Sequence, residues 1–331
     1  MRNDLVSIII PAYNAEKHIE RAVMSAVQQS YSDIEIIVIN DGSKDSTEEI
    51  LKRLAEENKQ VSYYTQKNMG VSVARNVGLE HIKGAFYMFV DADDALIENA
   101  VELMHKSIEE NNADIVVADF NIIDLSKNQV QRMHATKENK NYLPQEAISL
   151  AIEDNPITYS SCGKLYRSQK LQNIRFPEGM RAHEDSYYVF QCLMCDVRIT
   201  ILNIPLYEIY VTHGSASRSE FGDKYKDILS LAEKKERIIQ EKYPEQKDKA
   251  KTVMVKANMS VLYNLCVNSK KLNFRLINQC VKAVRSDNVY FIPATEFDKK
   301  FFWVITHNLV YLYRAYVQTR FYLKKLIKTE K

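Results

Sequence analysis

The stretch Val6-Ser-Ile-Ile-Ile-Pro-Ala-Tyr-Asn14 sets the pattern for the first half of this chain. Its β-branched run is typical of a buried strand, and Pro11 ends that run. Residues 15–29 then place apolar side chains at helical spacing, which predicts an amphipathic helix. A strand followed directly by a helix is the first half of a βαβ unit.

The same alternation continues to about residue 120. The expected strands are 34–39, 61–64, 85–90 and 114–120, and the expected helices are 45–57, 70–84 and 98–110. Apolar strands separated by helices predict an α/β fold, with a mostly parallel sheet covered by helices on both faces. In such sheets, ligands bind beyond the carboxyl ends of the strands.

The pattern changes after Phe120. Residues 121–142 are polar and are expected to form a loop, whereas residues 184–196 are expected to form a helix and residues 199–211 two short strands. From about residue 223 the chain is basic and helical in period. We therefore expect an α/β domain over 1–220 and a basic, mainly helical region over 221–331.

Composition and charge narrow the possible classes of protein. The 331 residues are 46% hydrophobic and 27% charged, which excludes wholesale disorder. Residues 1–200 carry 21 Lys and Arg against 30 Asp and Glu, whereas residues 201–331 carry 24 against 13. The acidic first part argues against nucleic acid as a partner, and the basic second part indicates an anionic neighbour.

The sequence gives no sign of export. Its 5 cysteines do not suggest a disulfide framework. Its first apolar run is too short for a signal peptide, and no run reaches the roughly 18 apolar residues of a membrane-spanning helix. We expect a cytoplasmic protein.

Two carboxylates, Asp91 and Asp93, follow the expected strand 85–90. Side chains two residues apart in extended backbone point to the same side. Such a pair suits Mg²⁺ or Mn²⁺, which completes its ligand shell with water and substrate phosphate oxygens. The alternative is an acidic turn before the next helix, and the pair alone does not decide between the two.

Polar clusters at the neighbouring elements favour the functional interpretation. They are Pro11-Ala-Tyr-Asn14, Asn40-Asp-Gly-Ser43, Asn68 to Asn76, Phe89-Val-Asp-Ala-Asp-Asp94 and His183-Glu-Asp185. In these five motifs the sequence resembles the family 2 glycosyltransferases of the Rossmann-like GT-A fold, in particular bacterial enzymes of exopolysaccharide and capsular polysaccharide synthesis. The resemblance covers about residues 5–215 and leaves the tail beyond 220 unexplained.

The resemblance implies a site for a UDP-sugar. The residues it assigns to the nucleotide-sugar are Pro11, Tyr13, Asn14, Asp41, Asn68, Arg75, Asp91 and Asp93. Tyr13 would stack on the base, and Asp41 would accept a hydrogen bond from the imide N–H of the base. Asp91 would contact the ribose, and Asp93 would bind Mn²⁺ or Mg²⁺ at the diphosphate. His213 is a third candidate ligand, with a hydrogen-bonded loop residue as the alternative.

Asp185 is the candidate general base, and Glu184 competes for that role. A sugar hydroxyl is a weak nucleophile, so a carboxylate must take its proton as the oxygen attacks the anomeric carbon. One base and no covalent intermediate would invert the anomeric configuration. The alternative for both residues is negative charge that stabilises a helix N-terminus.

Residues 301–328 combine aromatic and cationic side chains. At about 100° per residue, one helical face would carry His307, Arg314, Gln318 and Lys325. Basic helices with aromatic sides are typical of membrane interfaces, so we expect contact with the inner leaflet of the plasma membrane. The alternatives are packing on the protein's own helices or on a second copy in a homo-oligomer.

Together with these residues, the resemblance therefore implies an inverting, metal-dependent glycosyltransferase. It would move a hexose or N-acetylhexosamine from a UDP-sugar to a glycan or lipid-linked glycan acceptor in bacterial surface polysaccharide synthesis. The alternative is a catalytically silent protein of the same fold that binds only carbohydrate or nucleotide. The presence of both Asp93 and Asp185 favours the enzyme. The phosphate-binding glycine motifs of dehydrogenases and P-loop kinases are absent.

Overall fold

The computed structural model describes residues 2–133, 138–153, 156–180, 183–211, 224–269, 273–287, 291, 296–317 and 319. The chain divides into two compact units. The first comprises residues 1–149, 156–180 and 184–215, and the second comprises residues 150–155, 181–183 and 216–331. The predicted boundary at residue 220 lies outside the described residues and stays a prediction.

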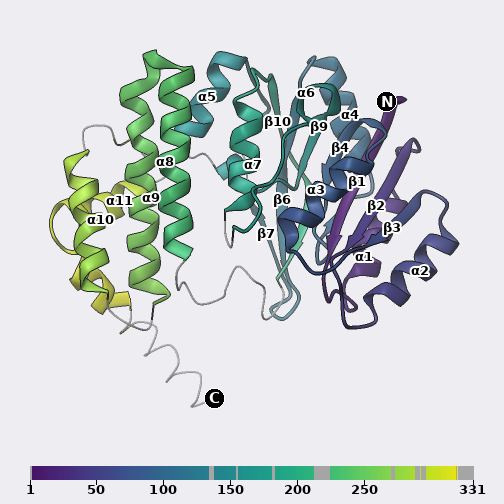
Figure 1. The fold of residues 1–331 in the computed structure, drawn as a ribbon, viewed down its shortest axis with the longest axis horizontal. Helices are drawn as coiled ribbons and strands as arrows, with labels where there is room; N and C mark the ends of the chain where they lie inside the picture. Colours follow the sequence, from purple (N-terminus) through teal and green to yellow (C-terminus); the bar gives the residue numbers. More distant parts are fainter. Residues whose placement is uncertain are drawn as a thin grey trace. The chain divides into compact units, whose positions relative to one another are not determined.

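The first unit is built on one sheet (Figure 1). Its described strands are β1 (Arg2–Ala12), β2 (Ile34–Asn40), β3 (Val61–Thr65), β4 (Gly84–Phe89), β5 (Ala95–Leu96), β6 (Ile115–Asp124), β7 (Gln129–Met133), β8 (Lys140–Tyr142), β9 (Lys164–Arg167) and β10 (Ile199–Tyr210). They pair in the order β3-β2-β1-β4-β9-β6-β10-β5, with β7 beside β6 and β8 beside β10. The half from β3 to β4 is parallel, whereas β9 runs antiparallel to both of its neighbours.

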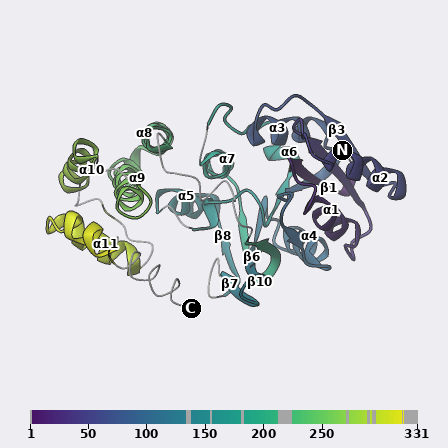
Figure 2. The same ribbon diagram turned by 90° about the horizontal axis from the view of Figure 1, so that it is seen from below.

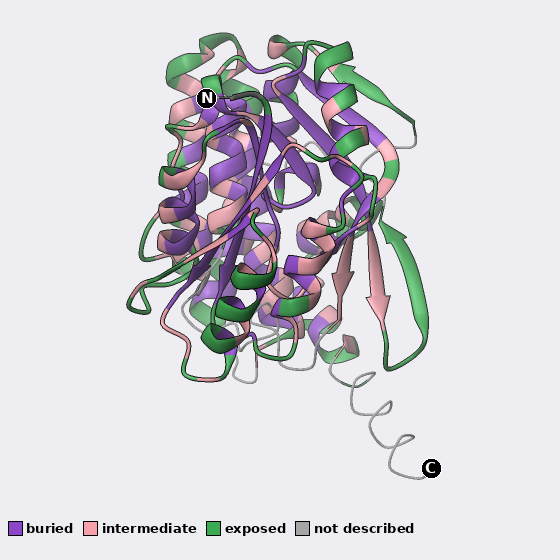
Figure 3. Ribbon diagram, turned by 90° about the vertical axis from the view of Figure 1, so that its right-hand side faces the viewer, coloured by how far each residue is buried: buried purple, intermediate pink, exposed green. Residues whose placement is uncertain are grey.

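Helices cover both faces of this sheet, as predicted. The first unit contains α1 (Ile19–Val27), α2 (Thr47–Glu57), α3 (Val71–His81), α4 (Ala100–Glu110), α6 (Ser168–Leu171) and α7 (Glu184–Leu193), and α5 (Pro144–Ile152) begins in it. Figure 2 shows α1 and α4 on one face and α3 and α6 on the other. The central strands are buried (Figure 3), which explains why β1 is a continuous apolar run rather than an alternating one.

Two expectations for the later strands were wrong. The described residues 121–133 and 138–142 are not one loop: β6 continues to Asp124, β7 pairs with β6, and β8 pairs with β10. Strand β7 is exposed along its whole length, so its residues are mostly polar and its sequence resembles that of a loop. The expected pair of strands over 199–211 is one strand, β10 (Ile199–Tyr210), whose register shifts on both sides of Pro205 interrupt the pattern.

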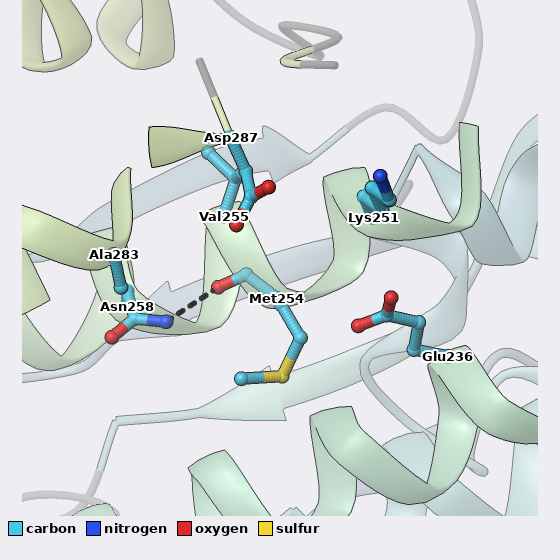
Figure 4. Close-up of a pocket in the computed structure, with 7 residues that line it drawn as sticks. All are labelled: Glu236, Lys251, Met254, Val255, Asn258, Ala283 and Asp287. Atoms are coloured by element: carbon cyan, nitrogen blue, oxygen red, sulfur yellow. Dashed lines mark hydrogen bonds between the residues drawn. The ribbon is translucent and has the colours of Figure 1, made fainter. Parts of the chain in front are cut away.

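The second unit is helical. Its described helices are α8 (Lys224–Lys242), α9 (Lys247–Val267), α10 (Phe274–Ser286) and α11 (Glu296–Thr306), and residues 310–317 are also helical. Helices α8, α9 and α10 surround a cavity of about 310 Å³ (Figure 4). Its lining residues include Glu236, Lys251 and Asp287. Burial and the charge of Asp287 raise the pKa of Glu236. Among the helices that the structure describes, none is long and apolar enough to cross a bilayer.

The structure corrects the expectation for one cation of the tail. Arg314 is buried, and its guanidinium donates hydrogen bonds to the backbone carbonyls of Leu265 and Ser269. It therefore joins the helical core and adds no charge to an exposed face. Of the other members of the expected face, His307 is exposed, whereas Gln318 and Lys325 lie outside the described side chains.

Candidate functional site

The predicted site residues gather at the carboxyl ends of β1, β2 and β4. Pro11 lies in β1 beside Ile39 of β2, and Asp91 follows β4. Tyr13 is an exposed ring just after β1, in keeping with a stacking surface. His213 lies outside the described residues.

Asn14 and Asp41 organise the loops at this edge. The Asn14 backbone N–H donates to Ser43 Oγ, and Asn14 Oδ1 accepts from the Lys44 N–H, so the loops after β1 and β2 are joined. Asp41 is buried, and its carboxylate accepts hydrogen bonds from the Gln66 side chain and from the backbone N–H groups of residues 69 and 70. This carboxylate thus holds the loop that enters α3, and its contact with a nucleotide base stays a prediction.

Gly42 lets the loop before α3 approach closely. Its φ of +69° favours glycine, and a Cβ there would lie 2.8 Å from the backbone nitrogen of Asn68. The sequence motifs at residues 40–43 and 68–76 are therefore in direct contact. The predicted nucleotide contact of Asn68 stays a prediction.

Arg75 joins Asp91, which follows β4, to Asp185, the candidate base. It projects from α3, its side chain is 3% exposed, and its guanidinium lies 2.8 Å from Asp91 Oδ1 and 2.7 Å from Asp185 Oδ1. Glu184 Oε1 is farther away, at 3.6 Å. Two motifs separated by more than ninety positions therefore share one cation. The predicted contact of Arg75 with the nucleotide stays a prediction.

The Asp185 carboxylate has one oxygen held and one available. Arg75 and Ser161 Oγ both donate to Oδ1, the serine from 2.8 Å. Among the described residues no group donates to Oδ2, and the side chain is 19% exposed. Burial raises the pKa of Asp185 to about 6, although Arg75 opposes the rise. A carboxylate of this pKa can take a proton near neutral pH.

A hydrogen-bond chain fixes the turn that carries the acidic cluster. The Asp91 N–H donates to the Tyr207 hydroxyl at 3.0 Å, and this hydroxyl donates to Asp94 Oδ2 at 2.9 Å. The Tyr210 N–H donates to the other oxygen of Asp94. Sequence reasoning assigned no role to Asp94 or Tyr207, because the contact joins residues 113 positions apart.

Arg21 supports the same turn from the other side. Its guanidinium donates to the Asp93 carbonyl and lies 3.6 Å from the centre of the Tyr210 ring. Asp94 faces inward, so Asp91 and Asp93 are left as the carboxylates nearer to solvent. Burial and the neighbouring charge of Asp91 raise the pKa of Asp93.

The residues present fit a hard divalent cation. No group of three acidic, histidine or cysteine ligands occurs in the part of the chain that the structure describes. Two carboxylates are nevertheless enough for Mg²⁺ or Mn²⁺ that takes its remaining ligands from water and phosphate. The repulsion between Asp91 and Asp93 is the electrostatic cost that such a cation would remove.

Comparison with known proteins finds matches over this same region. The sequence model described as Glycosyl transferase family 2 matches residues 7–175. Glycosyltransferase GlyA of Streptococcus pneumoniae is 32% identical over 65% of this chain, and the match spans 32% of GlyA, about a third of its length. An uncharacterized glycosyltransferase of Haemophilus influenzae is 30% identical over 69% of this chain and 86% of its own length.

The fold is shared with solved structures. Residues 1–349 of TarS from S. aureus match with a TM-score of 0.68 and 19% identity, over 95% of this chain and 90% of that one. A complex of the same TarS segment with UDP-GlcNAc also matches with a TM-score of 0.68. The likeness confirms the α/β architecture that the sequence motifs led us to expect.

Proposed function

The chain belongs to glycosyl transferase family 2, and on that premise we propose that it transfers a sugar from a UDP-sugar to a hydroxyl group of a glycan acceptor. The observation that carries the proposal is the Arg75 bridge. It keeps Asp185, the candidate base, beside Asp91 at the donor end of the sheet. A protein that only bound nucleotide would have no need for a carboxylate with one oxygen open to a proton.

The proposed reaction is a single displacement at the anomeric carbon. The acceptor oxygen forms a bond to that carbon while the bond to the UDP phosphate oxygen breaks, and UDP leaves with the electron pair. Asp185 Oδ2 takes the acceptor proton as the new bond forms. One displacement inverts the configuration of the sugar.

Asp91 and Asp93 would hold Mn²⁺ or Mg²⁺ in this proposal. Such an ion stabilises the negative charge of the departing diphosphate. The protein must also hold the carboxylates of Asp91 and Asp93 in place. Tyr207, Asp94 and Arg21 do this through the contacts that fix their turn.

UDP is the preferred nucleotide in this proposal because TarS, which shares the fold, is known in complex with UDP-GlcNAc. A hexose or N-acetylhexosamine donor and a surface-polysaccharide acceptor follow from the resemblance. The likeness to proteins named as glycosyltransferases supports the reaction class but leaves the sugar and the linkage to experiment.

A position in the cytoplasm, at the inner face of the plasma membrane, also belongs to this proposal. Arg314 cannot serve it, because that side chain is buried. The exposed apolar side chains of residues 301–317 support it instead: Trp303, Leu312 and Tyr316. A homo-oligomer remains a prediction from the sequence.

A donor screen with two matched variants tests the proposal. Purified protein is incubated with UDP-sugars and an acceptor, with and without Mn²⁺, and UDP release is measured. Asp185→Asn should bind UDP normally but lose at least about 100-fold in transfer, since general bases contribute that much or more. Glu184→Gln, on the same helical turn but farther from Arg75, should keep most of the activity. Near-normal transfer by Asp185→Asn would remove Asp185 as the base.

A further inference from the structure

The turn that precedes β9 places a buried serine, Ser161, within hydrogen-bond distance of the candidate base, Asp185. Ser161 is fully buried, and its hydroxyl donates to Asp185 Oδ1. The same oxygen accepts from Arg75. Two donors on one oxygen fix the rotation of the carboxylate and leave Oδ2 without a donor among the described residues.

Two hydrogen bonds between side-chain hydroxyls and backbone groups hold this turn in place. The Tyr166 hydroxyl donates to the Ser161 carbonyl at 2.9 Å, and the Cys162 N–H donates to Ser160 Oγ at 3.0 Å. Gly163 has a φ of +66°, and a Cβ there would lie 2.6 Å from the Phe120 ring. The chain can therefore make this turn against Phe120 only with glycine.

Lys164 is the unusual member of this group. It is 1% exposed, and its ammonium donates to the carbonyls of Ser160 at 2.5 Å and Cys162 at 3.5 Å. Within the described residues it has no ion-pair partner. Burial lowers the pKa of Lys164 to about 8, with Cys162 and Asp185 opposing the shift. Burying an ammonium on carbonyl partners alone is costly, so its position calls for a role.

We propose that Ser161 is a positioning residue for Asp185, and that the buried ammonium of Lys164 fixes the turn that presents the serine. The inference rests on the proposed role of Asp185 as the general base. Lys164 acts through the carbonyls on either side of Ser161 and touches neither the donor nor the acceptor. Its removal lets the turn move, so the serine hydroxyl no longer meets Oδ1.

Kinetics of single and double variants test this arrangement. Ser161→Ala should lower kcat about 10- to 100-fold, as expected for a lost hydrogen bond to a charged group, and leave the KM for the donor within about twofold. Ser161→Thr keeps a hydroxyl and should restore most of kcat. Lys164→Met should lower kcat to a similar extent. The double variant should be no worse than the more impaired single variant, because both changes remove the same contact.

Ser168→Ala is the matched control. Ser168 is equally buried, and its hydroxyl donates to the Gly84 carbonyl, away from Asp185. This variant should lose thermal stability and keep kcat. If Lys164→Met does not fold, Tyr166→Phe tests the other anchor and should give a smaller loss of kcat.

The outcomes separate this inference from the proposed function. Loss of transfer in Asp185→Asn together with normal kcat in Ser161→Ala would overturn the positioning role alone. Additive losses in the double variant would overturn the role of Lys164. If the protein turns over none of the UDP-sugars, carboxyl ¹³C NMR of Asp185 still tests the hydrogen bond from Ser161. Loss of the serine hydroxyl should raise the pKa of Asp185, and an unchanged titration curve would refute the contact.

Discussion

Replacing Arg75 by methionine tests whether one buried cation holds the two halves of the site together. The change keeps an apolar stem and removes the ion pairs to Asp91, Asp185 and Glu184. Breaking a buried pair typically costs about 3–5 kcal/mol, because the remaining charge has no partner. The carboxylates here are partly exposed, so we expect about 3 kcal/mol, or a fall in Tm of about 6–12 °C for a unit of this size.

The loss should also depend on pH. In the wild type the pKa of Asp185 is about 6, above the ordinary value of 3.8, so its ionisation costs stability as the pH rises through this range. Without Arg75 that pKa rises further. The deficit of the variant is therefore complete above the new pKa and shrinks as the pH falls to below about 6, where both proteins carry a protonated Asp185.

Thermal and urea unfolding between about pH 8 and about pH 5 would measure both effects. Arg53→Met is the control. Arg53 also pairs with two carboxylates, Glu20 and Glu57, but all three side chains are about half exposed. This variant should unfold like the wild type. An Arg75→Met protein as stable as the wild type at high pH, or a deficit that is equal at both ends of the range, would refute the reasoning.

Two further predictions concern the metal and the membrane. Asp93→Ala should abolish turnover and lower the Mn²⁺-dependent affinity for UDP at least about tenfold in calorimetry, because one of two metal carboxylates is lost; unchanged metal-dependent affinity would count against the metal site. Replacing Trp303, Leu312 and Tyr316 together by serine should reduce sedimentation with phosphatidylglycerol vesicles at least about tenfold. Leu125→Ser, an equally exposed change in the sheet unit, should not, and equal sedimentation of both variants would remove the membrane proposal.

Local patterns in the sequence were enough to predict β1, α1 and the parallel half of the sheet. In these elements the apolar period, the turn residues and the burial agree along one short stretch. Strand β9 could not be found this way. It has four residues, two of them cationic, and its partners in β4 and β6 lie about 80 and 50 positions away, respectively. Only long-range pairing distinguishes such a segment from a loop.

Motifs identified candidate site residues but not their contacts. Asp41 was expected to face a base, and the structure gives its carboxylate three donors from the loop before α3. Arg75 is predicted to contact the nucleotide, and the structure shows that it also pairs with carboxylates from two different motifs. A residue type indicates what a side chain can bind, whereas its partners depend on how distant segments pack. Ser161, which no motif suggested, illustrates the same limit.

The antiparallel strand β9 helps to place the candidate base at the same edge of the sheet as Asp91. Parallel strands bring their carboxyl ends to one edge, which accounts for Asp91 and its neighbours. The base comes from α7, on a later part of the chain. Because β9 runs against β4 and β6, the turn before it lies where Ser161 reaches Asp185, and Arg75 closes the link from α3. The reversed strand between β4 and β6 thus places Ser161 at the edge of the sheet where Arg75 joins Asp91 to Asp185.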